Sequence, residues 1–347
     1  MKRLLKDVVV QQRSSLKLSD VAESGKYPVF GAAGLVGYRN TYQTDLPSVA
    51  IIKDGAGIGR VSLLPKNSSV LGTMQMLTPN ADVDNVFLYY YLTHLHLGKS
   101  FTGSTIPHIY FRNYGASLFP RFKHDEQVRI AIDLTNISNA IENKHVQLNM
   151  LDGLVKSRFM EMFGDPNGNP LNWQIGKISD VAKCVAGATP STSVPTYWEN
   201  GSIPWLSSGE VNKYRIYETD SKITQEGYAH TSTKMVPAHT VVLAMAGQGK
   251  TRGTAAMAEI SLCTNQSICS LVNNEKINPE FLLALLKNQY DELRAASNGA
   301  EGRGGLNLKI IGSFPIYIPP IELQNDFARF VKLVDKSRFV CHSRNFL

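Results

Sequence analysis

The longest regular stretch of the chain is HDEQVRIAIDLTNISNAIENKHVQLNMLDGLVKSRFMEM, residues 124–162. It contains no proline, and apolar residues recur along it at spacings of three, four and seven. This is the heptad pattern of a long helix that packs against another helix. The apolar seam consists of Ile130, Leu134, Ile137, Ile141, Leu148, Leu151 and Val155. The pattern ends at Gly164, just before Asp165 and Pro166, as expected for a helix C-terminus.

A helix of about 38 residues would be about 57 Å long at ~1.5 Å per residue, which is more than the core of one small domain requires. We therefore expect a second helix to cover the apolar seam. Residues 320–347 continue the same spacing with Leu323, Phe327, Phe330 or Val331, and Val334. The main prediction is an antiparallel pair of helices within the chain. An intermolecular coiled-coil dimer is the alternative.

Similar segments occur in the same order on the two sides of the long helix, which predicts an internal duplication. Each copy contains an apolar strand that ends in glycines and, later, a short apolar helix. Each copy also ends at proline, before a helix that contains Gln127 or Gln324. The matching pairs are KLSDVA (17–22) with KISDVA (177–182), SVAIIKDGAGIGRVSLL (48–64) with TVVLAMAGQGKTRGTAAM (240–257), LGTMQML (71–77) with LCTNQSICSL (262–271), and FLYYYLTHL (87–95) with FLLALLKNQ (281–289).

The composition supports two folded domains. A chain of 347 residues is too long for one typical core, and 43% hydrophobic with 19% charged residues is typical of globular proteins. No run of about 18 apolar residues predicts a membrane span, and the N-terminal apolar run is too short for a signal peptide. The four cysteines lack metal-ligand spacing, so we expect reduced thiols, no metal and a cytoplasmic location. The net charge of +7 is compatible with a polyanionic partner.

Two divergent copies with SDVA segments, glycine-ended strands and the junction MEMFGDP…LNW (160–173) resemble the specificity subunit of type I restriction-modification enzymes. The resemblance covers nearly the whole chain. It implies an α+β fold with two tandem, pseudo-twofold-related α/β target recognition domains, separated by long helices that form an antiparallel coiled coil. The implied recognition domains are residues 1–122 and 165–319, and the implied spacer helices are residues 123–164 and 320–347.

The resemblance also implies a function. Each recognition domain would read one half of an asymmetric, split sequence in double-stranded DNA, and the helices would set the gap between the halves. The helices would also bind two modification methyltransferase subunits, and restriction and translocase subunits would join through these. The chain itself would not be an enzyme and would need no cofactor, because S-adenosylmethionine, ATP and Mg²⁺ would act on the partner subunits. The sequence agrees in lacking an Asn-Pro-Pro-aromatic methyltransferase motif.

One departure from the family pattern concerns the second helix. Aligning Gln324 with Gln127 places Leu347 opposite Met150, so the second helix is expected to be about 14 residues shorter than the first. This puts in question the full spacer length and the binding of the second methyltransferase subunit.

Candidate DNA contacts lie in the loops of both copies. Arg and Lys read guanine, Asn and Gln read adenine, and basic residues also bind phosphates. Gln75 and Gln266 follow matching Thr-x pairs, so we expect them to form structural hydrogen bonds instead. The candidates are Arg39, Lys53, Arg60, His108, Tyr110 and Arg112 in the first copy, and Lys213, Tyr214, Arg215, Gln248, Lys250, Arg252, Arg303 and Lys309 in the second.

Two motifs invite other interpretations. AMAGQGKTRGT (244–254) resembles a phosphate-binding loop but lacks its first glycine, and a strand is expected after it where such a loop needs a helix. We expect this stretch and KDGAGIGR (53–60) to form tight turns near DNA, with a plain hairpin turn as the alternative. His94 and His96, two residues apart on a predicted helix, cannot chelate one metal ion there.

Three alternative functions remain open. A type IIB specificity subunit differs in its partner and in its cutting pattern. A nucleotide-binding protein would use the Gly-Lys-Thr loop. A structural coiled-coil adaptor would have no affinity for DNA.

Overall fold

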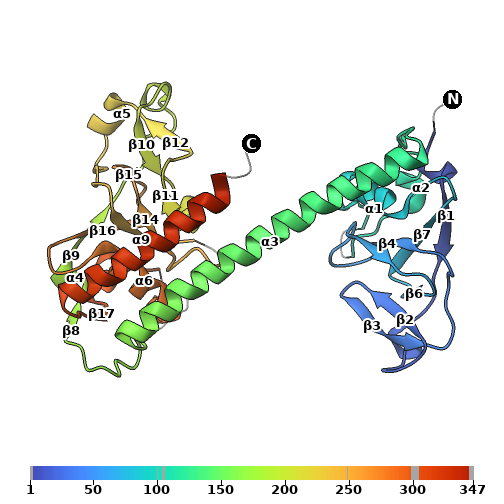
Figure 1. Cartoon of the computed structure of the whole chain (residues 1–347). Coiled ribbons are helices and arrows are strands. Elements are labelled where there is room, and N and C mark those ends of the chain that lie inside the picture. Colours follow the sequence, from blue (N-terminus) through green and yellow to red (C-terminus); the bar gives the residue numbers. More distant parts are fainter. Residues whose placement is uncertain (1–2, 100, 104–105, 248, 298–304, 344–347) are drawn as a thin grey trace. The chain divides into compact units, whose positions relative to one another are not determined.

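The structure, a computed structural model, describes residues 3–99, 101–103, 106–247, 249–297 and 305–343, with side chains as far as residue 338 in the last helix. The chain divides into two compact units, unit 1 (Met1–Asn143) and unit 2 (Lys144–Leu347) (Figure 1). The division falls within helix α3 (His124–Phe163), so each unit includes part of this helix. Both units combine helices with strands, which confirms the predicted α+β class with two tandem units.

Unit 1 is built on an antiparallel sheet with the strand order β1-β7-β4-β5. β4 (Ser48–Ile52) lies inside the sheet and is buried along its whole length, as its continuous apolar run predicts. The other strands of this sheet are β1 (Val9–Arg13), β5 (Val61–Leu64) and β7 (Met74–Pro79). A smaller sheet, β3-β2-β6, consists of β2 (Tyr27–Gly31), β3 (Gly34–Arg39) and β6 (Ser69–Val70).

Helix α1 (Asn85–His94) packs on the main sheet of unit 1 and forms the core with it. Asp84 caps the helix, because its carboxylate accepts a hydrogen bond from Phe87 N at 2.8 Å. Phe87, Leu88 and Leu92 are buried against the sheet. The remaining short elements are η1 (Leu5–Asp7), η2 (Leu18–Asp20), η3 (Leu97–Lys99) and α2 (Phe111–Tyr114).

Unit 2 repeats this plan with additions. Its main sheet has the order β11-β14-β13-β16-β9, and smaller sheets join β12-β10-β15 and β17-β8. The strands are β8 (Ile175–Lys177), β9 (Ala182–Ala186), β10 (Ile203–Leu206), β11 (Arg215–Ile216), β12 (Ser221–Ile223), β13 (Thr240–Ala244), β14 (Ala255–Ala258), β15 (Cys263–Thr264), β16 (Ile268–Asn273) and β17 (Pro315–Tyr317). The helices are α4 (Ile178–Val181), η4 (Pro195–Tyr197), η5 (Ser208–Asn212), α5 (Gln225–Ala229), α6 (Pro279–Asn288), α7 (Tyr290–Ala296), α8 (Leu308–Ser313) and α9 (Ile321–Ser343).

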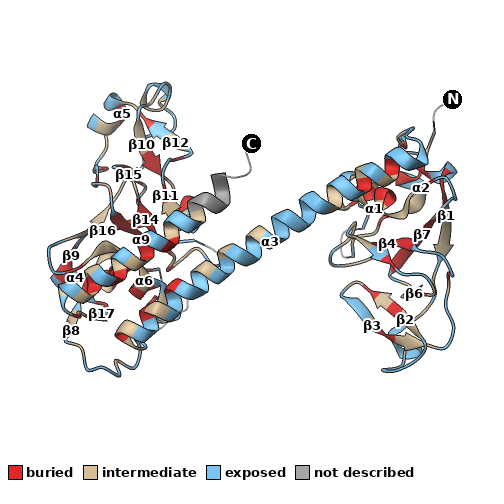
Figure 2. Ribbon diagram, in the orientation of Figure 1, coloured by how far each residue is buried: buried red, intermediate tan, exposed pale blue. Residues whose placement is uncertain are grey.

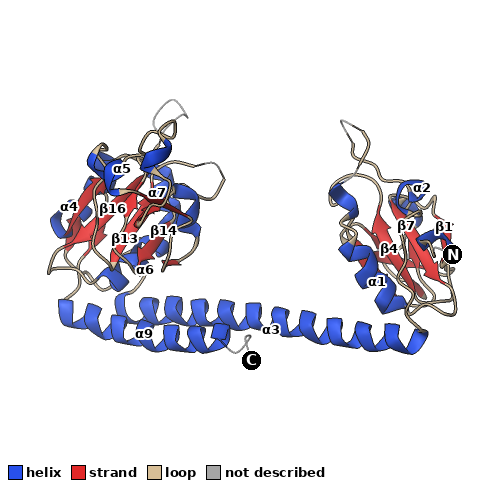
Figure 3. Cartoon of the chain, turned by 90° about the horizontal axis from the view of Figure 1, so that it is seen from above, coloured by secondary structure: helices blue, strands red, loops and turns tan. Residues whose placement is uncertain are grey.

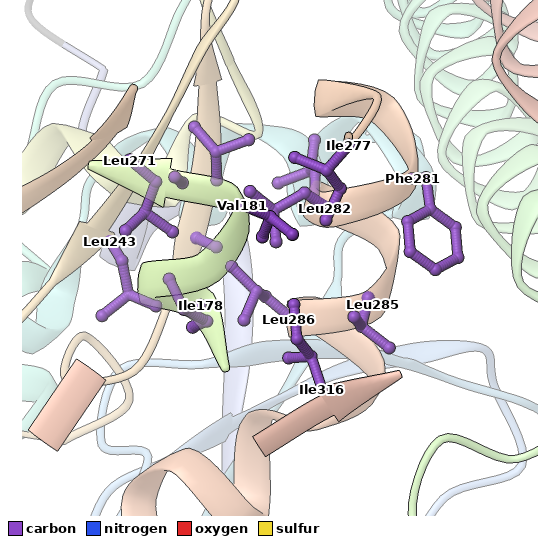
Figure 4. Close-up of a cluster of buried hydrophobic side chains, with 14 of the residues drawn as sticks. Ile178, Val181, Leu243, Leu271, Ile277, Phe281, Leu282, Leu285, Leu286 and Ile316 are labelled. Carbon is purple, nitrogen blue, oxygen red and sulfur yellow. The ribbon is translucent and has the colours of Figure 1, made fainter. Parts of the chain in front are cut away.

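The core of unit 2 forms where α6 packs on the main sheet (Figure 4). Asn278 caps α6 through a 2.9 Å bond from Glu280 N, and Pro279 occupies the first helical turn, where its missing N–H costs nothing. The side chains that meet in this core are Ile178, Val181, Leu243, Leu271, Ile277, Phe281, Leu282, Leu285, Leu286 and Ile316.

Equivalent hydrogen bonds define how the two copies correspond. Asn80 N donates to Val8 O at 3.0 Å, and Asn274 N donates to Val181 O at 2.8 Å. The two asparagine side chains bind the carbonyls of Asp7 and Asp180. β1 and β9 then pair in the same way with β7 and β16. The structural counterpart of KISDVA (177–182) is therefore LLKDVV (4–9).

The match between KLSDVA (17–22) and KISDVA is consequently wrong as an alignment of the fold, since residues 17–22 come after β1. Both segments contain the same local cap, in which an Asp carboxylate accepts from a backbone N–H three residues earlier. The bonds are Lys17 N to Asp20 at 2.8 Å and Lys177 N to Asp180 at 2.7 Å. Leu4 N and Asp7 form a third such cap at 3.1 Å. The sequence similarity of the two segments thus reflects the same local turn and not equivalent positions in the fold.

The match between Gln75 and Gln266 is also wrong. Gln75 lies opposite Ile51 in the β4–β7 pair, and Cys269 lies opposite Leu243 in the equivalent β13–β16 pair. Gln75 is buried and donates to the carbonyls of Gln12 and Met76, which agrees with its expected structural role. Gln266 is exposed, and it accepts a hydrogen bond from the Thr189 hydroxyl.

A buried glutamine joins each long helix to the strands and helices that come before it in the chain. Gln127 Oε1 accepts from Asp84 N at 3.1 Å, and its Nε2 donates to the carbonyls of Asp82 and Phe122 at 3.0 Å. Gln324 Oε1 accepts from Asn278 N at 2.8 Å, and its Nε2 donates to the carbonyls of Lys276 and Pro319. Both side chains are 0% exposed. The same three bonds in both copies confirm that the chain is an internal duplication.

Within unit 2, α9 packs antiparallel to the end of α3 (Figure 3). The ring of Phe327 lies 5.6 Å from those of Phe159 and Phe163, whereas Arg338, further along α9, binds Asp152, an earlier residue of α3, at 2.6 Å. The predicted seam residues Leu151, Val155, Leu323, Phe327, Val331 and Val334 all belong to this core. The antiparallel arrangement agrees with the main prediction.

The predicted seam is wrong in the middle of α3, which is exposed (Figure 2). Ile137 and Ile141 are 55% and 53% exposed, because α9 pairs with the later turns of α3. Ile130 instead packs on the core of unit 1, and Leu134 is half-buried. Leu148 lines a cavity of about 590 Å³ beside Tyr214.

Arg215 is the centre of a buried ion network in unit 2. Its guanidinium binds Glu280 through two bonds of 3.0 and 2.8 Å and also binds Glu259 and Asp335. The Arg215 side chain is only 10% exposed. Burial opposes its charge, but the hydrogen bonds that Arg215 donates to Glu280 and the nearby carboxylates outweigh burial and raise the pKa of Arg215. The network joins β11, α6 and α9.

The ring of Tyr214 lies beside three cations of the same network. Lys287 Nζ is 4.0 Å from the ring centroid, and the guanidinium carbons of Arg338 and Arg215 are 5.0 and 5.3 Å away. Burial raises the pKa of Tyr214 to about 12 and lowers that of Lys287. Tyr214 also has a positive φ of 33°, so the network holds a strained backbone in place.

The glutamine contacts predict local losses of stability. Gln127→Ala leaves the Asp84 N–H and the carbonyls of Asp82 and Phe122 without their glutamine partner, which should cost about 2–4 kcal/mol. Hydrogen exchange should show the loss of protection around α1 only, whereas Gln324→Ala should affect α6 only. Asn139→Ala, which removes an exposed amide from α3, should change protection by no more than about 0.5 kcal/mol. Equal effects of Gln127→Ala on both units would contradict this assignment.

The ion network predicts a large effect of one arginine. Arg215→Met should destabilise unit 2 by about 3–5 kcal/mol, because it leaves the half-buried Glu259, Glu280 and Asp335 without the guanidinium that they share. Urea unfolding measures this loss, and hydrogen exchange should place it at β11, α6 and α9. Arg215→Lys retains the charge but not the two-bond contact with Glu280, so it should cost less. A neutral effect of Arg215→Met would show that the network does not stabilise the unit.

Candidate nucleic-acid interface

A glycine loop follows the central strand in each unit and closes in the same way. Ile52 N donates to Arg60 O, and Gly59 N donates back to Ile52 O at 2.8 Å. In unit 2, Ala244 N donates to Thr254 O, and Gly253 N donates to Ala244 O, both at 2.9 Å. The loop of unit 2 is two residues longer. It leads into strand β14, so the helix that a phosphate-binding loop requires is absent from this position.

Glycine is needed where each loop meets the helical segment that follows α1 or α6. Gly59 has a φ of +80°, and a Cβ atom there would lie 2.2 Å from Gly98 N. Gly253 has a φ of +86° and approaches Tyr290 and Arg294 of α7. Both loops are therefore supported from beneath by the fold, which holds the basic residues of the loops in defined positions.

A returning segment crosses the base of each loop. Ile109 N donates to Lys53 O at 2.9 Å, and Leu306 N donates to Met245 O at 3.1 Å. In unit 1 this crossing brings His108 beside Asp54, and the two residues also form a backbone bridge. The loop and residues 106–112, which are far apart in the sequence, thus form one surface.

The crossing brings together four of the predicted contacts of unit 1. His108 Nδ1 is 2.7 Å from Asp54 Oδ1, and Lys53 Nζ is 3.8 Å from Asp54 Oδ2. The Tyr110 ring is nearly parallel to that of His108, with centroids 6.4 Å apart, and the Arg112 guanidinium carbon lies 5.0 Å from the Tyr110 centroid. The result is a layered set of planar and cationic groups.

The two remaining candidates of unit 1 lie in different places. Arg60 is exposed at the end of the glycine loop, and its guanidinium folds over Gly57. Arg39 is half-buried at the end of β3, opposite Tyr27 in the smaller sheet. The structure therefore places Arg60 with the loop and Arg39 on another sheet.

In unit 2, α7 fixes the loop that carries Lys250 and Arg252. Tyr290 Oη donates to Lys250 O at 2.7 Å. Arg294 Nη1 donates to Gly249 O at 2.8 Å and to Arg252 O at 3.2 Å. The Lys250 side chain is exposed, and that of Arg252 is half-buried. Gln248 and Arg303 lie outside the described residues.

The other candidates of unit 2 are not at this loop. Lys213 is exposed and pairs with Asp220 at 2.7 Å and Glu210 at 3.3 Å. The hydrogen bond that Lys213 donates to Asp220 is the main cause of its raised pKa. Tyr214 and Arg215 belong to the ion network beside α9, so we leave them out of the proposed DNA surface. Lys309 is exposed on α8 and lines an open groove of about 670 Å³ with Lys177 and Lys183.

Sequence reasoning missed three residues that shape these loops: Asp54, Tyr290 and Arg294. Asp54 lies within the glycine motif, where a carboxylate beside Lys53 is itself a signal. Tyr290 and Arg294 face the loop from a helix 40 residues later, and no pattern in the sequence indicates that contact.

The part of the chain that the structure describes contains no group of three or more His, Cys, Asp or Glu residues placed to bind a metal ion. Among the described helices, none combines the length and the apolar character that crossing a membrane requires.

Comparison with known proteins gives relatives of one kind. The chain is 27% identical over 161 residues to the Type I restriction enzyme EcoR124I/EcoR124II specificity subunit of Escherichia coli, an alignment that covers 46% of this chain and 39% of that one. It is 22% identical over 312 residues to the MjaVIII specificity subunit of Methanocaldococcus jannaschii, covering 83% and 72%. The chain thus spans about two fifths of the length of the first of these relatives.

The solved type I S subunit from M. genitalium has the same fold, with a TM-score of 0.67 at 17% identity, covering 99% of this chain and 91% of that one. The family described as "Type I restriction modification DNA specificity domain" matches residues 1–151 and again residues 170–341. The two matched regions correspond to the two copies of the duplication. The chain therefore belongs to the family of type I restriction modification DNA specificity domains.

Proposed function

We propose that this chain is the non-catalytic DNA-reading subunit of a type I restriction-modification complex. Its target would be an asymmetric, bipartite sequence in double-stranded DNA, with one half-site for each unit. The observation that carries this proposal is the contrast between the two units: their strands and buried glutamines correspond, whereas the residues at their glycine loops differ. A shared framework with different loops suits two different half-sites.

Recognition would combine two kinds of contact. Exposed cations such as Arg60 and Lys250 would bind phosphates and set the register on the duplex. The planar groups held at the loops, His108 and Tyr110 among them, would approach base edges. Loops supported by Gly98 and by α7 are suited to this task because less conformational entropy is lost on binding.

We assign the recognition domains to residues 1–122 and 165–319, and the spacer helices to residues 123–164 and 320–347. The spacer helices would set the gap between half-sites and bind two methyltransferase subunits, through which restriction and translocase subunits would join. S-adenosylmethionine, ATP and Mg²⁺ would act on those partners, and the complex would work in the cytoplasm.

Methylation mapping tests the proposed function directly. The chain would be co-expressed with its methyltransferase subunit in a host without DNA methylation, and methylated sites would be read by single-molecule sequencing. We expect a split, asymmetric motif that requires this chain. Methylation that persists without the chain would contradict the proposal. A stable complex that produces no methylation would also contradict it.

DNA affinity provides a second test. Replacing one phosphate-binding cation should weaken binding to all duplexes and reduce the slope of log Kd against log salt by about 1. Arg60→Ala and Lys250→Ala, one in each unit, should behave in this way. Lys222→Ala removes an exposed charge from β12 and is the matched control, with no expected change in the slope. If Arg60→Ala and Lys250→Ala had the same slope of log Kd against log salt as Lys222→Ala, the glycine loops would not belong to the proposed interface.

A further inference from the structure

We infer that Asp54 is a positioning residue for base recognition: it holds the His108 ring so that Nε2 accepts a hydrogen bond from the amino group of an adenine or a cytosine. This inference rests on the proposed function and specifies it for unit 1. It names the chemistry of one contact and the side chain that determines it.

The geometry determines which nitrogen carries the proton. His108 Nδ1 is 2.7 Å from Asp54 Oδ1, which is within hydrogen-bond distance. An ionised carboxylate can only accept, so Nδ1 must donate. In a neutral imidazole the other nitrogen, Nε2, then has a free lone pair and acts as an acceptor. Among the described residues, no partner is placed to occupy Nε2.

The backbone on both sides holds the pair in this arrangement. Gly55 N donates to Pro107 O at 3.0 Å, and Ile109 N donates to Lys53 O at 2.9 Å, so the two segments are tied just before and just after the pair. His108 also exchanges two backbone hydrogen bonds with Thr102, of 2.7 and 2.9 Å.

The ring itself is packed on more than one side. Tyr110 lies nearly parallel to it, and a Cβ atom at Gly103 would lie 3.3 Å from His108 Cδ2. The ring therefore has little freedom to turn away from Asp54, and its 35% exposed side chain presents a defined edge to solvent.

The pair is not part of the shared framework. Lys53 corresponds to Met245, and Ile109 corresponds to Leu306, because the same crossing hydrogen bond joins each pair. Asp54 and His108 therefore correspond to Ala246 and Gly305, which cannot form this contact. Unit 2 folds without the pair, so the pair is better explained by a role specific to unit 1 than by the needs of the fold.

The surrounding charges favour the approach of DNA. Lys53 lies 3.8 Å from Asp54 and offsets its negative charge, and Arg112 lies over Tyr110. Arg60 adds an exposed cation on the same loop. Cations that flank an imidazole can bind the two phosphate backbones of a groove whose base edges the ring contacts.

The acceptor role determines which bases fit. In the major groove, adenine N6 and cytosine N4 present donors, whereas guanine N7 and O6 and thymine O4 present acceptors. An Nε2 lone pair would bind the first two and face an unfavourable acceptor on the others. The half-site read by unit 1 should therefore specify A or C at one position on the contacted strand.

Methylation mapping with paired variants tests this contact. Asp54→Asn and His108→Ala should both relax the same single position, which specifies A or C on one strand in the wild-type motif. The gap and the other half-site should remain unchanged. Asp45→Asn removes the same charge from an exposed site of unit 1 and should leave the motif intact. A structural role for the pair would instead reduce methylation at all positions together.

The tautomer is measured separately by ¹⁵N NMR of the full chain labelled at histidine, at about pH 8.5, where histidine is ordinarily neutral. We expect the His108 signals, assigned by their loss in His108→Ala, to show a proton on Nδ1 and to change in Asp54→Asn. A proton on Nε2 in the wild type would overturn the inference. A motif that neither variant alters would also overturn it but would leave the proposed function standing, whereas no motif at all would contradict both.

Discussion

A single buried amide at the base of each long helix organises the structure. Gln127 and Gln324 satisfy the backbone N–H of the residue that caps α1 or α6, together with two carbonyls that have no other place in a helix or strand. A long helix without this contact would leave its first turn free to pivot on the domain before it. Because an unpaired buried polar group is costly, the contact also fixes the direction in which the helix leaves the fold. Under the proposed function, in which the helices set the gap between half-sites, this direction would determine where the recognised sequences lie.

The two units show how such a fold can vary its loops while its core stays the same. Their central strands, capped helices and crossing segments are the same, so the core does not depend on what the loops present. The contacts that hold the two loops in place differ. In unit 1 the loop packs on Gly98 through Gly59, and in unit 2 side chains of α7 bind the loop. Each loop can therefore vary in length and charge without disturbing β4 or β13.

Regular periodicity was the most informative part of the sequence. The heptads of α3 predicted a second, paired helix, and the order of the repeat predicted the tandem units, because these features come from local patterns. The α+β class was implied by the family resemblance. The exact correspondence of the copies was not predictable in this way, since three segments contain the same Asp cap. Only strand pairing shows that Asp7 of the first copy is equivalent to Asp180 of the second. Arg215 looked like a surface cation because its carboxylates, Glu259, Glu280 and Asp335, are 44 to 120 residues away in the sequence. The contacts of Asp54 with His108 and of Arg294 with the loop were missed for the same reason: these partners are near only in the fold.

The ion network around Arg215 restricts how the proposed second recognition domain could be exchanged between related chains. Asp152, Asp335 and Arg338 lie on α3 and α9, whereas Arg215, Glu259 and Glu280 lie in the sheet and helices of unit 2 that these two helices pack against. A chimera that received a foreign second domain without an arginine in this place would leave half-buried Asp335 with Arg338 of the same helix as its remaining cation. Under the proposed function, a compatible second domain would therefore match α9 in charge as well as in shape, and this requirement would limit which new specificities the scaffold could acquire.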